Sequence, residues 1–260
     1  MARGRVGSEG TQPVKSAVRT IELLEFFGRT QTKRSLGEIH ARLNYPKSSL
    51  YVLLQTLIQL GWVETDQTGL LYGLGARALL VGSAYLDGDE MVKLAGAAMD
   101  RLARETTETV HLARLDRTDV VYLASRESEH YLRPFSRVGR RLPAHSTALG
   151  KALLAERSDD ELRELLPEQL EALTERTCTS RDALLEDLAS TRRRGYATER
   201  EENTLGLSCF GVALRTRTPP TDALSCSIPV ARLNPARAKS IAASLRAARD
   251  AIESAAKGLT

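Results

Sequence analysis

The chain has 260 residues, of which 42% are hydrophobic and 27% charged. This composition is typical of a soluble globular protein with about two domains, and it excludes a largely disordered chain. No apolar run reaches the roughly 18 residues of a membrane-spanning helix, and residues 1–12 lack the apolar core of a secretory signal. Three cysteines (Cys178, Cys209 and Cys226) are too few for a disulfide scaffold and predict a cytoplasmic protein.

The excess of positive charge lies in the first third of the chain. Residues 1–78 hold 10 Lys+Arg and 6 Asp+Glu, and because the whole chain holds 37 and 33, the remainder has 27 of each. A small basic domain joined to a larger neutral domain is typical of proteins in which one domain binds a polyanion and the other has a different function.

The first third predicts three helices followed by a hairpin. We expect a disordered tail over residues 1–13, a helix over 14–27 that Gly28 ends, a second helix from the capping box Ser35–Glu38 to residue 43, and a third over 46–60. In the third helix the inward positions are expected at Leu50, Leu53, Leu54, Leu57 and Leu60. Short strands at 62–64 and 70–72 complete a winged helix-turn-helix over residues 14–75.

The third helix of such a domain enters the major groove of double-stranded DNA, where it needs hydrogen-bonding side chains on its exposed face. We therefore predict DNA contacts from Lys47, Ser48, Ser49, Tyr51 and Gln55 of this helix, and we add Arg34 and Ser35 at the start of the second helix. The alternative is an ordinary solvated helix face in a protein-interaction domain that binds no DNA.

A nearly uncharged helix is predicted over 74–86, and we assign residues 76–89 as a linker helix that ends close to Gly88. The next helix, 90–106, carries an apolar stripe at helical spacing, formed by Met91, Leu94, Ala95, Ala98 and Leu102. Such a stripe is either core or a dimer interface.

Residues 90–260 predict an α+β domain with an antiparallel sheet. Strands are expected at 109–115, 120–127, 132–138, 207–215 and 223–229. Helices are expected from Ser146, from the capping box Ser158–Glu161, from Ser180 to the Gly195 stop, and from Asn234-Pro235 to the end of the chain.

Five motifs follow one another along the chain: VKSAVRTIELL at 14–24, the helix from Lys47-Ser-Ser to LGWV at 60–63, LPAHSTALGKALLA at 142–155, RGYATEREENTLGLSCFGV at 194–212 and ALSCSIPV at 223–230. In this order and spacing they resemble the IclR family of bacterial transcription regulators. The resemblance implies a winged helix-turn-helix, a linker helix and a GAF-like effector domain, in a homodimer or dimer of dimers that represses or activates transcription at operator DNA. The chain departs from the family's pattern at Val52, where relatives often carry Arg, and its predicted wing at 62–74 contains no Lys or Arg.

The same resemblance implies an effector-binding site formed by Ala148, Leu149, Glu199, Cys209, Ser225 and Ser227. N–H groups at a helix start, two serine hydroxyls on one strand face and a thiol are donors that suit a small organic acid. Glu199 stands where the family often has Asp. If the ligand is a carboxylate, Glu199 lies at its other end or is protonated, because adjacent anions repel.

Other chemistry finds little support in the sequence. Gly150-Lys151 lacks the remaining residues of a phosphate loop, the cysteines lack zinc-ligand spacing, and the G-x-S-x-G elbow of hydrolases is absent. We expect no catalytic residue, metal or cofactor. Two classes of function remain: a ligand-responsive transcription regulator, and a ligand-binding or enzymatic α+β domain whose N-terminal helices bind protein. Salt-dependent binding to duplex DNA distinguishes them.

Overall fold

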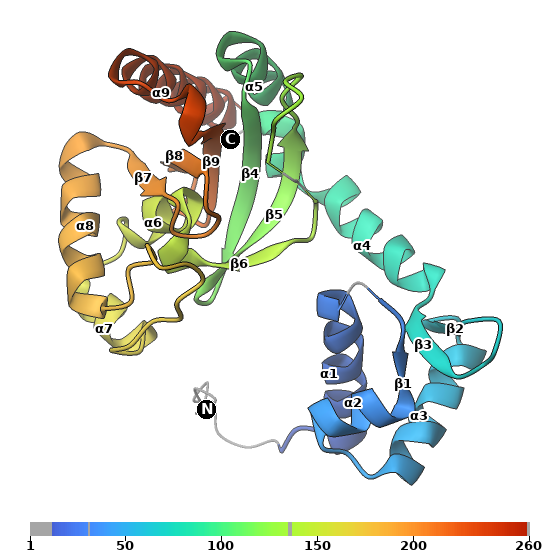
Figure 1. Ribbon diagram of the computed structural model, residues 1–260. Coiled ribbons are helices and arrows are strands. Elements are labelled where there is room, and N and C mark those ends of the chain that lie inside the picture. Colours follow the sequence, from blue (N-terminus) through green and yellow to red (C-terminus); the bar gives the residue numbers. More distant parts are fainter. Residues whose placement is uncertain (1–11, 31, 135–136, 259–260) are drawn as a thin grey trace. The chain divides into compact units, whose positions relative to one another are not determined.

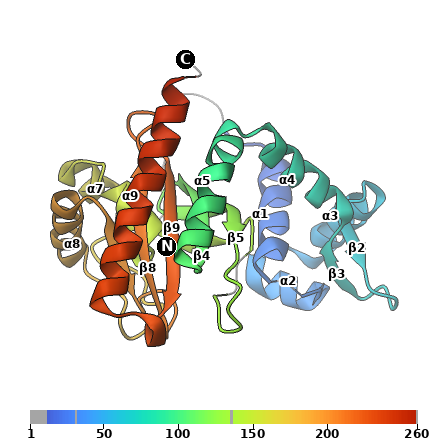
Figure 2. The same cartoon turned by 90° about the horizontal axis from the view of Figure 1, so that it is seen from above.

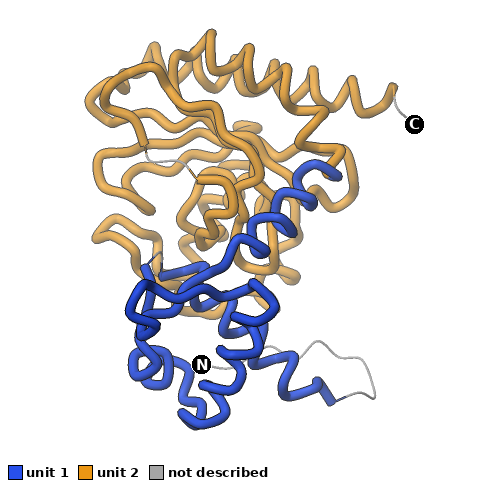
Figure 3. The backbone as a smooth tube through the Cα atoms, turned by 90° about the vertical axis from the view of Figure 1, so that its right-hand side faces the viewer, with its two compact units in different colours: residues 1–88 blue, residues 89–260 orange. Residues whose placement is uncertain are grey.

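The computed structural model describes residues 12–30, 32–134 and 137–258. The expected disordered tail at 1–13 lies almost entirely outside the described residues. The chain divides into two compact units, residues 1–88 and 89–260, which are described separately (Figure 3).

The first unit combines helices with a three-stranded antiparallel sheet (Figure 1). Its elements are α1 (Lys15–Thr30), β1 (Arg34–Ser35), α2 (Leu36–Leu43), α3 (Lys47–Gln59), β2 (Val63–Thr65), β3 (Leu71–Leu74) and α4 (Ala76–Gly88). The capping box that opens α2 is confirmed: the Ser35 hydroxyl accepts the Glu38 amide N–H, and the Glu38 carboxylate accepts the Ser35 N–H. Leu23, Leu50 and Leu54 form the centre of a core that is closed to solvent.

Two expectations for this unit are wrong. Gly28 does not end α1, which continues to Thr30, because Gly28 keeps an ordinary helical backbone at a position with open space around it. Leu60 is not an inward position of α3. It follows the last helical residue and is 53% exposed, since the helical repeat that buries Leu50, Leu54 and Leu57 ends before it.

The second unit is a six-stranded antiparallel sheet between two layers of helices. Its strands are β4 (Thr109–Asp116), β5 (Asp119–Arg126), β6 (Arg141–Pro143), β7 (Ala197–Arg200), β8 (Leu207–Leu214) and β9 (Asp222–Pro229), in the spatial order β6-β5-β4-β9-β8-β7. The helices are α5 (Glu90–Thr106), η1 (Ala144–Ser146), α6 (Ala148–Leu154), α7 (Asp159–Leu165), α8 (Arg181–Arg194), η2 (Val230–Arg232) and α9 (Pro235–Lys257). Figure 2 shows α5 and α9 side by side over the sheet, where they contact β4, β8 and each other.

Helix α6 covers the opposite face of this sheet, and α7 and α8 pack behind it. Leu149 and Leu153 of α6 lie in one buried cluster with Ala113 of β4, Tyr122 of β5 and Leu188 of α8. The predicted caps of this unit are confirmed, namely the capping box at the start of α7 and a left-handed glycine at the end of α8.

The strand expected at 132–138 is wrong for its described residues, which form no strand, and residues 135–136 lie outside the described part. Leu132 and Val138, whose apolar character favoured a strand, are 62% and 43% exposed. The sheet edge is instead β6, which pairs Val120 with Leu142.

The apolar surfaces of α5 and α4 differ in burial. Met91, Ala95, Ala98 and Leu102 of α5 are buried within the second unit, so they are core and not a free face. Helix α4 buries none of its residues and exposes four large apolar side chains: Leu79, Leu80, Val81 and Tyr85. No helix within the described ranges is long and apolar enough to cross a membrane.

Candidate functional site

The exposed face of α3 carries most of the predicted DNA-contacting residues. Lys47, Ser48, Ser49 and Tyr51 are exposed over its first turns, while Gln55 lies one turn further along and is half-buried. The Ser49 hydroxyl donates to the Pro46 carbonyl at 3.1 Å, which fixes this side chain close to the helix start.

Arg34 and Ser35 do not belong to that face. They form β1, and both bind the same carboxylate: the Arg34 guanidinium lies 3.0 Å and the Ser35 hydroxyl 2.8 Å from the oxygens of Glu38. Both side chains therefore bind to Glu38 in the first turn of α2. The wing between β2 and β3 carries a negative charge, since Asp66 accepts hydrogen bonds from Thr68 and from backbone amides that lower its pKa to about 2.

A cavity in the second unit brings all six predicted effector residues together. It encloses about 510 Å³ free of atoms, its open mouth included. Its lining consists of His111, Tyr122, Pro134, Arg140, Leu142, Thr147, Ala148, Leu149, Glu199, Asn203, Thr204, Leu207, Cys209, Ser225 and Ser227.

Strand register explains why residues so distant in sequence meet. Glu199 of β7 pairs with Cys209 of β8, Cys209 pairs with Ser227 of β9, and Ser225 pairs with His111 of β4. Side chains of alternate residues point to the same face of a strand, so these pairs form adjacent rows on one face of the sheet.

Two glycines let the start of α6 pack closely. A Cβ atom on Gly211 of β8 would lie 2.4 Å from the Ala148 carbonyl oxygen, so a larger residue there would push α6 away from the sheet. A Cβ atom on Gly150 would lie 2.2 Å from the Ala144 oxygen, so a larger residue there would push α6 away from η1. The sidechain of Thr147 caps α6 by accepting the Gly150 N–H at 3.0 Å.

Glu199 is the only predicted effector residue that carries an acid group, and it is 2% exposed. Its Oε1 accepts the N–H groups of Glu202 at 2.6 Å and Asn203 at 3.3 Å, so it also holds the β7–β8 loop. Burial raises its pKa to about 7. Burial and the nearby Glu199 also raise the pKa of Cys209, whose protonated thiol lies 3.2 Å from the Ser227 hydroxyl.

The sequence did not predict three lining residues whose side chains can bind a ligand through hydrogen bonds or charge: His111, Tyr122 and Arg140. His111 is 3% exposed, its Nδ1 lies 2.9 Å from the Ser125 hydroxyl, and burial lowers its pKa to about 3, so it is neutral at pH 7. Its ring packs edge-on against Tyr122 at 5.0 Å. The alternation of residues 109–115 places His111 on one face of its strand. That Ser225 of β9 lies beside it depends on pairing between segments far apart in the sequence, which no local pattern indicates.

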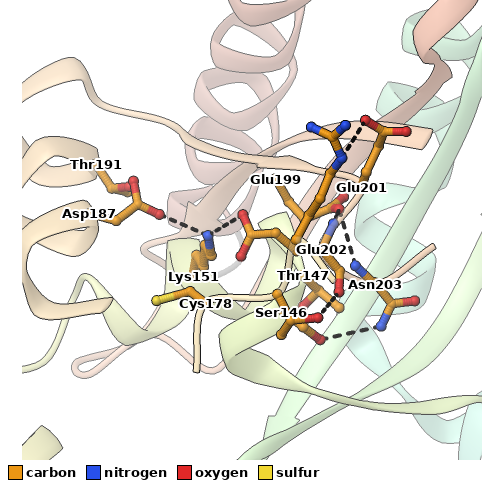
Figure 4. Close-up of polar contacts among 12 residues, drawn as sticks. Ser146, Thr147, Lys151, Cys178, Asp187, Thr191, Glu199, Glu201, Glu202 and Asn203 are labelled. Carbon is orange, nitrogen blue, oxygen red and sulfur yellow. Dashed lines mark hydrogen bonds and ion pairs between the residues drawn. The ribbon is translucent and has the colours of Figure 1, made fainter. Parts of the chain in front are cut away.

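An ion cluster around the buried Lys151 holds the β7–β8 loop against α6 (Figure 4). The Lys151 ammonium, 2% exposed as a residue, lies 2.9 Å from Asp187 of α8 and 2.6 Å from Glu202 of the loop. Burial opposes the ammonium charge, but the two carboxylates outweigh it and the pKa of Lys151 is raised. The Asn203 amide then donates to the Ser146 hydroxyl at 3.3 Å, which ties the loop to the residues before α6.

Comparison with known proteins agrees with this architecture. Residues 16–67 match the IclR helix-turn-helix domain, and residues 83–254 match the bacterial transcriptional regulator IclR C-terminal domain. The chain belongs to the IclR family. The HTH-type transcriptional regulator KdgR of Escherichia coli is 36% identical over 239 residues, 90% of each chain. The Transcriptional repressor IclR of the same organism is 34% identical, over 89% of this chain and 87% of the relative.

Solved structures place the fold in the same family. The IclR protein of Thermotoga maritima superposes with a TM-score of 0.69 at 27% identity, over 92% of this chain and 97% of its own. An IclR regulator from Alicyclobacillus acidocaldarius, at 23% identity, shares the fold with a TM-score of 0.83 over 94% of this chain and 100% of its own. The protein is thus an IclR-type transcription regulator with a helix-turn-helix DNA-binding domain, and its relatives are regulators and not enzymes. Within the described ranges no three His, Cys, Asp or Glu side chains are arranged to hold a metal ion.

Proposed function

We propose that this regulator is controlled by a small organic acid bound in the cavity of its second unit. The observation that carries the proposal is the convergence of Glu199, Cys209, Ser225 and Ser227 with the start of α6 around one cavity. In this view residues 14–75 bind the operator, residues 76–89 link the domains, and residues 90–260 bind the effector.

The lining supplies the donors that an organic acid needs. Ser225 and Ser227 offer hydroxyls on one strand, and the amides of Ala148 and Leu149 belong to the first turn of α6, where helical N–H groups have no acceptor within the helix. An IclR homologue from Microbacterium hydrocarbonoxydans, which shares the fold at 24% identity and a TM-score of 0.77 over 94% of this chain and 100% of its own, was solved in complex with 4-hydroxybenzoate. That complex supports an organic acid as the ligand class.

A thermal-shift screen of carboxylic acids tests this proposal. A ligand present at 100 times its Kd stabilises the folded protein by about 2.7 kcal/mol. Removing the Ser227 hydroxyl should weaken binding by about 1–3 kcal/mol, because a ligand oxygen loses its partner. Ser254→Ala, on the exposed side of α9, is the matched control and should change nothing. If Ser227→Ala binds the same acids as tightly as the parent, the ligand lies elsewhere.

On the DNA side, we propose that α3 reads the major groove through Lys47, Ser48, Ser49 and Tyr51, with Gln55 deeper in the interface and Arg34 and Ser35 at its margin. Loss of one base contact costs about 1–3 kcal/mol and relaxes specificity at one base pair. The triple variant Lys47→Ala, Ser48→Ala, Tyr51→Ala should therefore lose operator affinity, whereas Gln59→Ala at the far end of α3 should keep it. Unchanged affinity of the triple variant for the operator would show that these side chains of α3 do not contact DNA.

We also propose that the protein works as a homodimer or a dimer of dimers. One short recognition helix with a wing that lacks basic residues makes few contacts with DNA. Two copies of the protein that bind half-sites about 34 Å apart combine the contacts of both recognition helices. The exposed apolar side chains of α4, including Leu79 at 74% exposure, are the surface that pairing would cover. Sedimentation should show a dimer or tetramer at micromolar concentration, and Leu79→Ser should shift it toward monomer. A parent monomer that binds the operator tightly contradicts the proposal.

A further inference from the structure

The second unit has another cavity beside the last turn of α6, whereas the effector cavity lies at its first turn. This second cavity has about 450 Å³ free of atoms, its open mouth included, and no described residue lines both cavities. Strand β8 contributes Ala213 to its lining. The charged residues of the described lining are Glu156, Arg192, Arg215 and Arg249.

The second cavity lies beside β8, beyond the end of the edge strand β7 (Figure 1). β8 pairs with β9 over its whole length, but β7 pairs with it only as far as Gly211. The Leu207 N–H donates to the Thr204 carbonyl at 3.2 Å, and the Leu207 carbonyl accepts the Glu201 N–H at 2.7 Å, so both groups of Leu207 point to the β7 side. Because this direction alternates along an antiparallel strand, the N–H and C=O of Ala213 point to the same side.

The unpaired part of this strand edge is one residue long. Before Ala213, Gly211 pairs with Ala197 of β7, and after it the Arg215 N–H donates to the Glu253 carboxylate of α9 at 2.8 Å. Within the described ranges the N–H and C=O of Ala213 have no hydrogen-bond partner on this side, although Ala213 is 7% exposed. A donor and an acceptor left unpaired in a nearly buried place favour a bound group that pairs with both.

The guanidinium groups of Arg192, Arg215 and Arg249 are held in a common way. Each donates from Nε and Nη2 to backbone carbonyls or to a carboxylate, at distances of 2.7–3.1 Å. Among the described residues no acceptor binds the Nη1 group of any of the three. Three residues of the lining therefore keep charged N–H donors for a further acceptor.

Arg249 lies alongside the unpaired edge. On α9 it lies between Arg246, whose guanidinium is 5.8 Å from the centre of the Tyr196 ring, and Glu253, which binds the next N–H of the strand edge. Tyr196 comes directly before β7, so these two contacts lie on either side of Ala213. The Arg249 side chain, 16% exposed, is the least exposed of the three guanidinium groups.

These groups match the two charged ends of a single amino acid. In an antiparallel pair, one residue exchanges both backbone hydrogen bonds with the residue opposite. An amino acid opposite Ala213 can do the same, with its carboxylate accepting the N–H and its ammonium donating to the C=O. Arg249 offers the carboxylate a charged donor, and Glu156, which binds Arg215 on the C=O side of Ala213, offers the ammonium a charged acceptor.

We propose that the second cavity is a binding site for a free α-amino acid. Its carboxylate binds the Ala213 N–H and Arg249, and its ammonium binds the Ala213 C=O and Glu156. The lining favours a zwitterion over a polyanion, because each of its guanidinium groups already binds a carbonyl or carboxylate of the protein. A peptide strand would need a longer unpaired edge. The site is separate from the effector cavity and does not depend on the ligand of that cavity.

NMR of selectively labelled full-length protein tests the site at the Ala213 amide. Isotope labels on the valine carbonyl carbon and the alanine nitrogen mark Val-Ala amides, which in this sequence are those of Ala213 and Ala231. The standard L-α-amino acids are added one at a time at millimolar concentration. At least one should shift the Ala213 signal and leave that of Ala231, which lies in η2 and outside the cavity lining.

Blocked forms of the amino acid that gives the largest shift test its two ends. The N-acetyl derivative lacks the ammonium and the methyl ester lacks the carboxylate. Each should bind about 10- to 150-fold more weakly, since a charged hydrogen bond is lost. A form blocked at both ends that binds as tightly as the amino acid would indicate a site for a peptide strand and would overturn the proposal.

Substitution of Arg249 tests the carboxylate end. Arg249→Gln should weaken binding of the same amino acid about 10- to 150-fold. Urea unfolding should match that of the parent, because among the described residues Arg249 hydrogen-bonds to the exposed Asp250 beside it. Arg163→Gln is the matched control: this arginine of α7 pairs with the nearby Asp160 at 3.2 Å and does not line the cavity, so affinity should be kept.

Three further results would overturn the proposal. The first is that no standard L-α-amino acid shifts the Ala213 signal. The second is that Arg249→Gln binds the amino acid as tightly as the parent does. The third is that Ser227→Ala weakens its binding, which would place the amino acid in the effector cavity.

Discussion

Replacing Glu199 with glutamine should stabilise the second unit at high pH and leave it unchanged at low pH. The carboxyl group has a pKa of about 7 in the folded protein against an ordinary value of 4.5, because burial disfavours its charge. Because the pKa of Glu199 is higher in the folded than in the unfolded protein, folding is most favourable below pH 4.5, where the carboxyl group is protonated in both states. This contribution to the free energy of unfolding is lost as the pH rises from 4.5 to 7. The difference in pKa corresponds to about 3 kcal/mol, at 1.36 kcal/mol per unit.

Glutamine keeps an acceptor for the Glu202 and Asn203 N–H groups and never ionises. The free energy of unfolding of Glu199→Gln, minus that of the parent, should therefore rise by about 3 kcal/mol from pH 4.5 to pH 8.

Urea unfolding followed by far-UV circular dichroism measures this difference, with both proteins studied from pH 4.5 to 8. The single tryptophan, Trp62, lies in the first unit, so its fluorescence transition is an internal control that should not differ between the two proteins. Glu164→Gln, at an exposed acid of α7, is the matched surface control. A stability difference that stays constant across this pH range would refute the reasoning, since it would mean that Glu199 titrates alike in the folded and unfolded states.

Three further substitutions have expected outcomes. Lys151→Met should destabilise the second unit by about 1–3 kcal/mol in urea, because the half-buried Glu202 loses its cation and Asp187 keeps only Arg194, and wild-type stability would show that the cluster is not coupled to the fold. Leu54→Ala, at a fully buried position, should cost about 2–5 kcal/mol by the Trp62 fluorescence transition, whereas Val52→Ala, 64% exposed on the same helix, should change stability by less than about 0.5 kcal/mol. Gly211→Ala should cost about 1–3 kcal/mol in circular dichroism and weaken acid binding, because its Cβ would displace the start of α6, and full retention of both properties would contradict the close packing described here.

Sequence reasoning located the features that local chemistry determines. A capping box needs only four consecutive residues, so the starts of α2 and α7 were predicted from Ser35–Glu38 and Ser158–Glu161. A left-handed Gly195 after three arginines likewise gave the end of α8. Strands of two to four residues, such as β1, β6 and β7, carry no periodic signal of their own and exist only through pairing with distant partners.

The same distinction explains what was predicted of the cavity. Its six expected residues came from motifs that resemble a family. His111, Tyr122 and Arg140 join them only because β4 pairs with β9, β5 pairs with β4, and Arg140 pairs with Tyr122 of β5. Lys151 follows Gly150 in a segment that lacks the other residues of a phosphate loop, so the sequence predicts no role for it. Its partners lie 36 and 51 residues away, and no local pattern connects them.

Binding of the acid to the second unit should change the affinity of the protein for DNA, and one titration measures this coupling. A duplex selected from random sequence by the parent protein is titrated by fluorescence anisotropy, with and without the carboxylic acid that gives the largest thermal shift. The acid should change the parent's affinity for this duplex by about 5- to 150-fold. Ser227→Ala should bind the duplex as the parent does without the acid, and it should need about 5- to 150-fold more acid for the same response. An equal response in both proteins, or an acid that binds the parent without changing its affinity for DNA, would contradict the account.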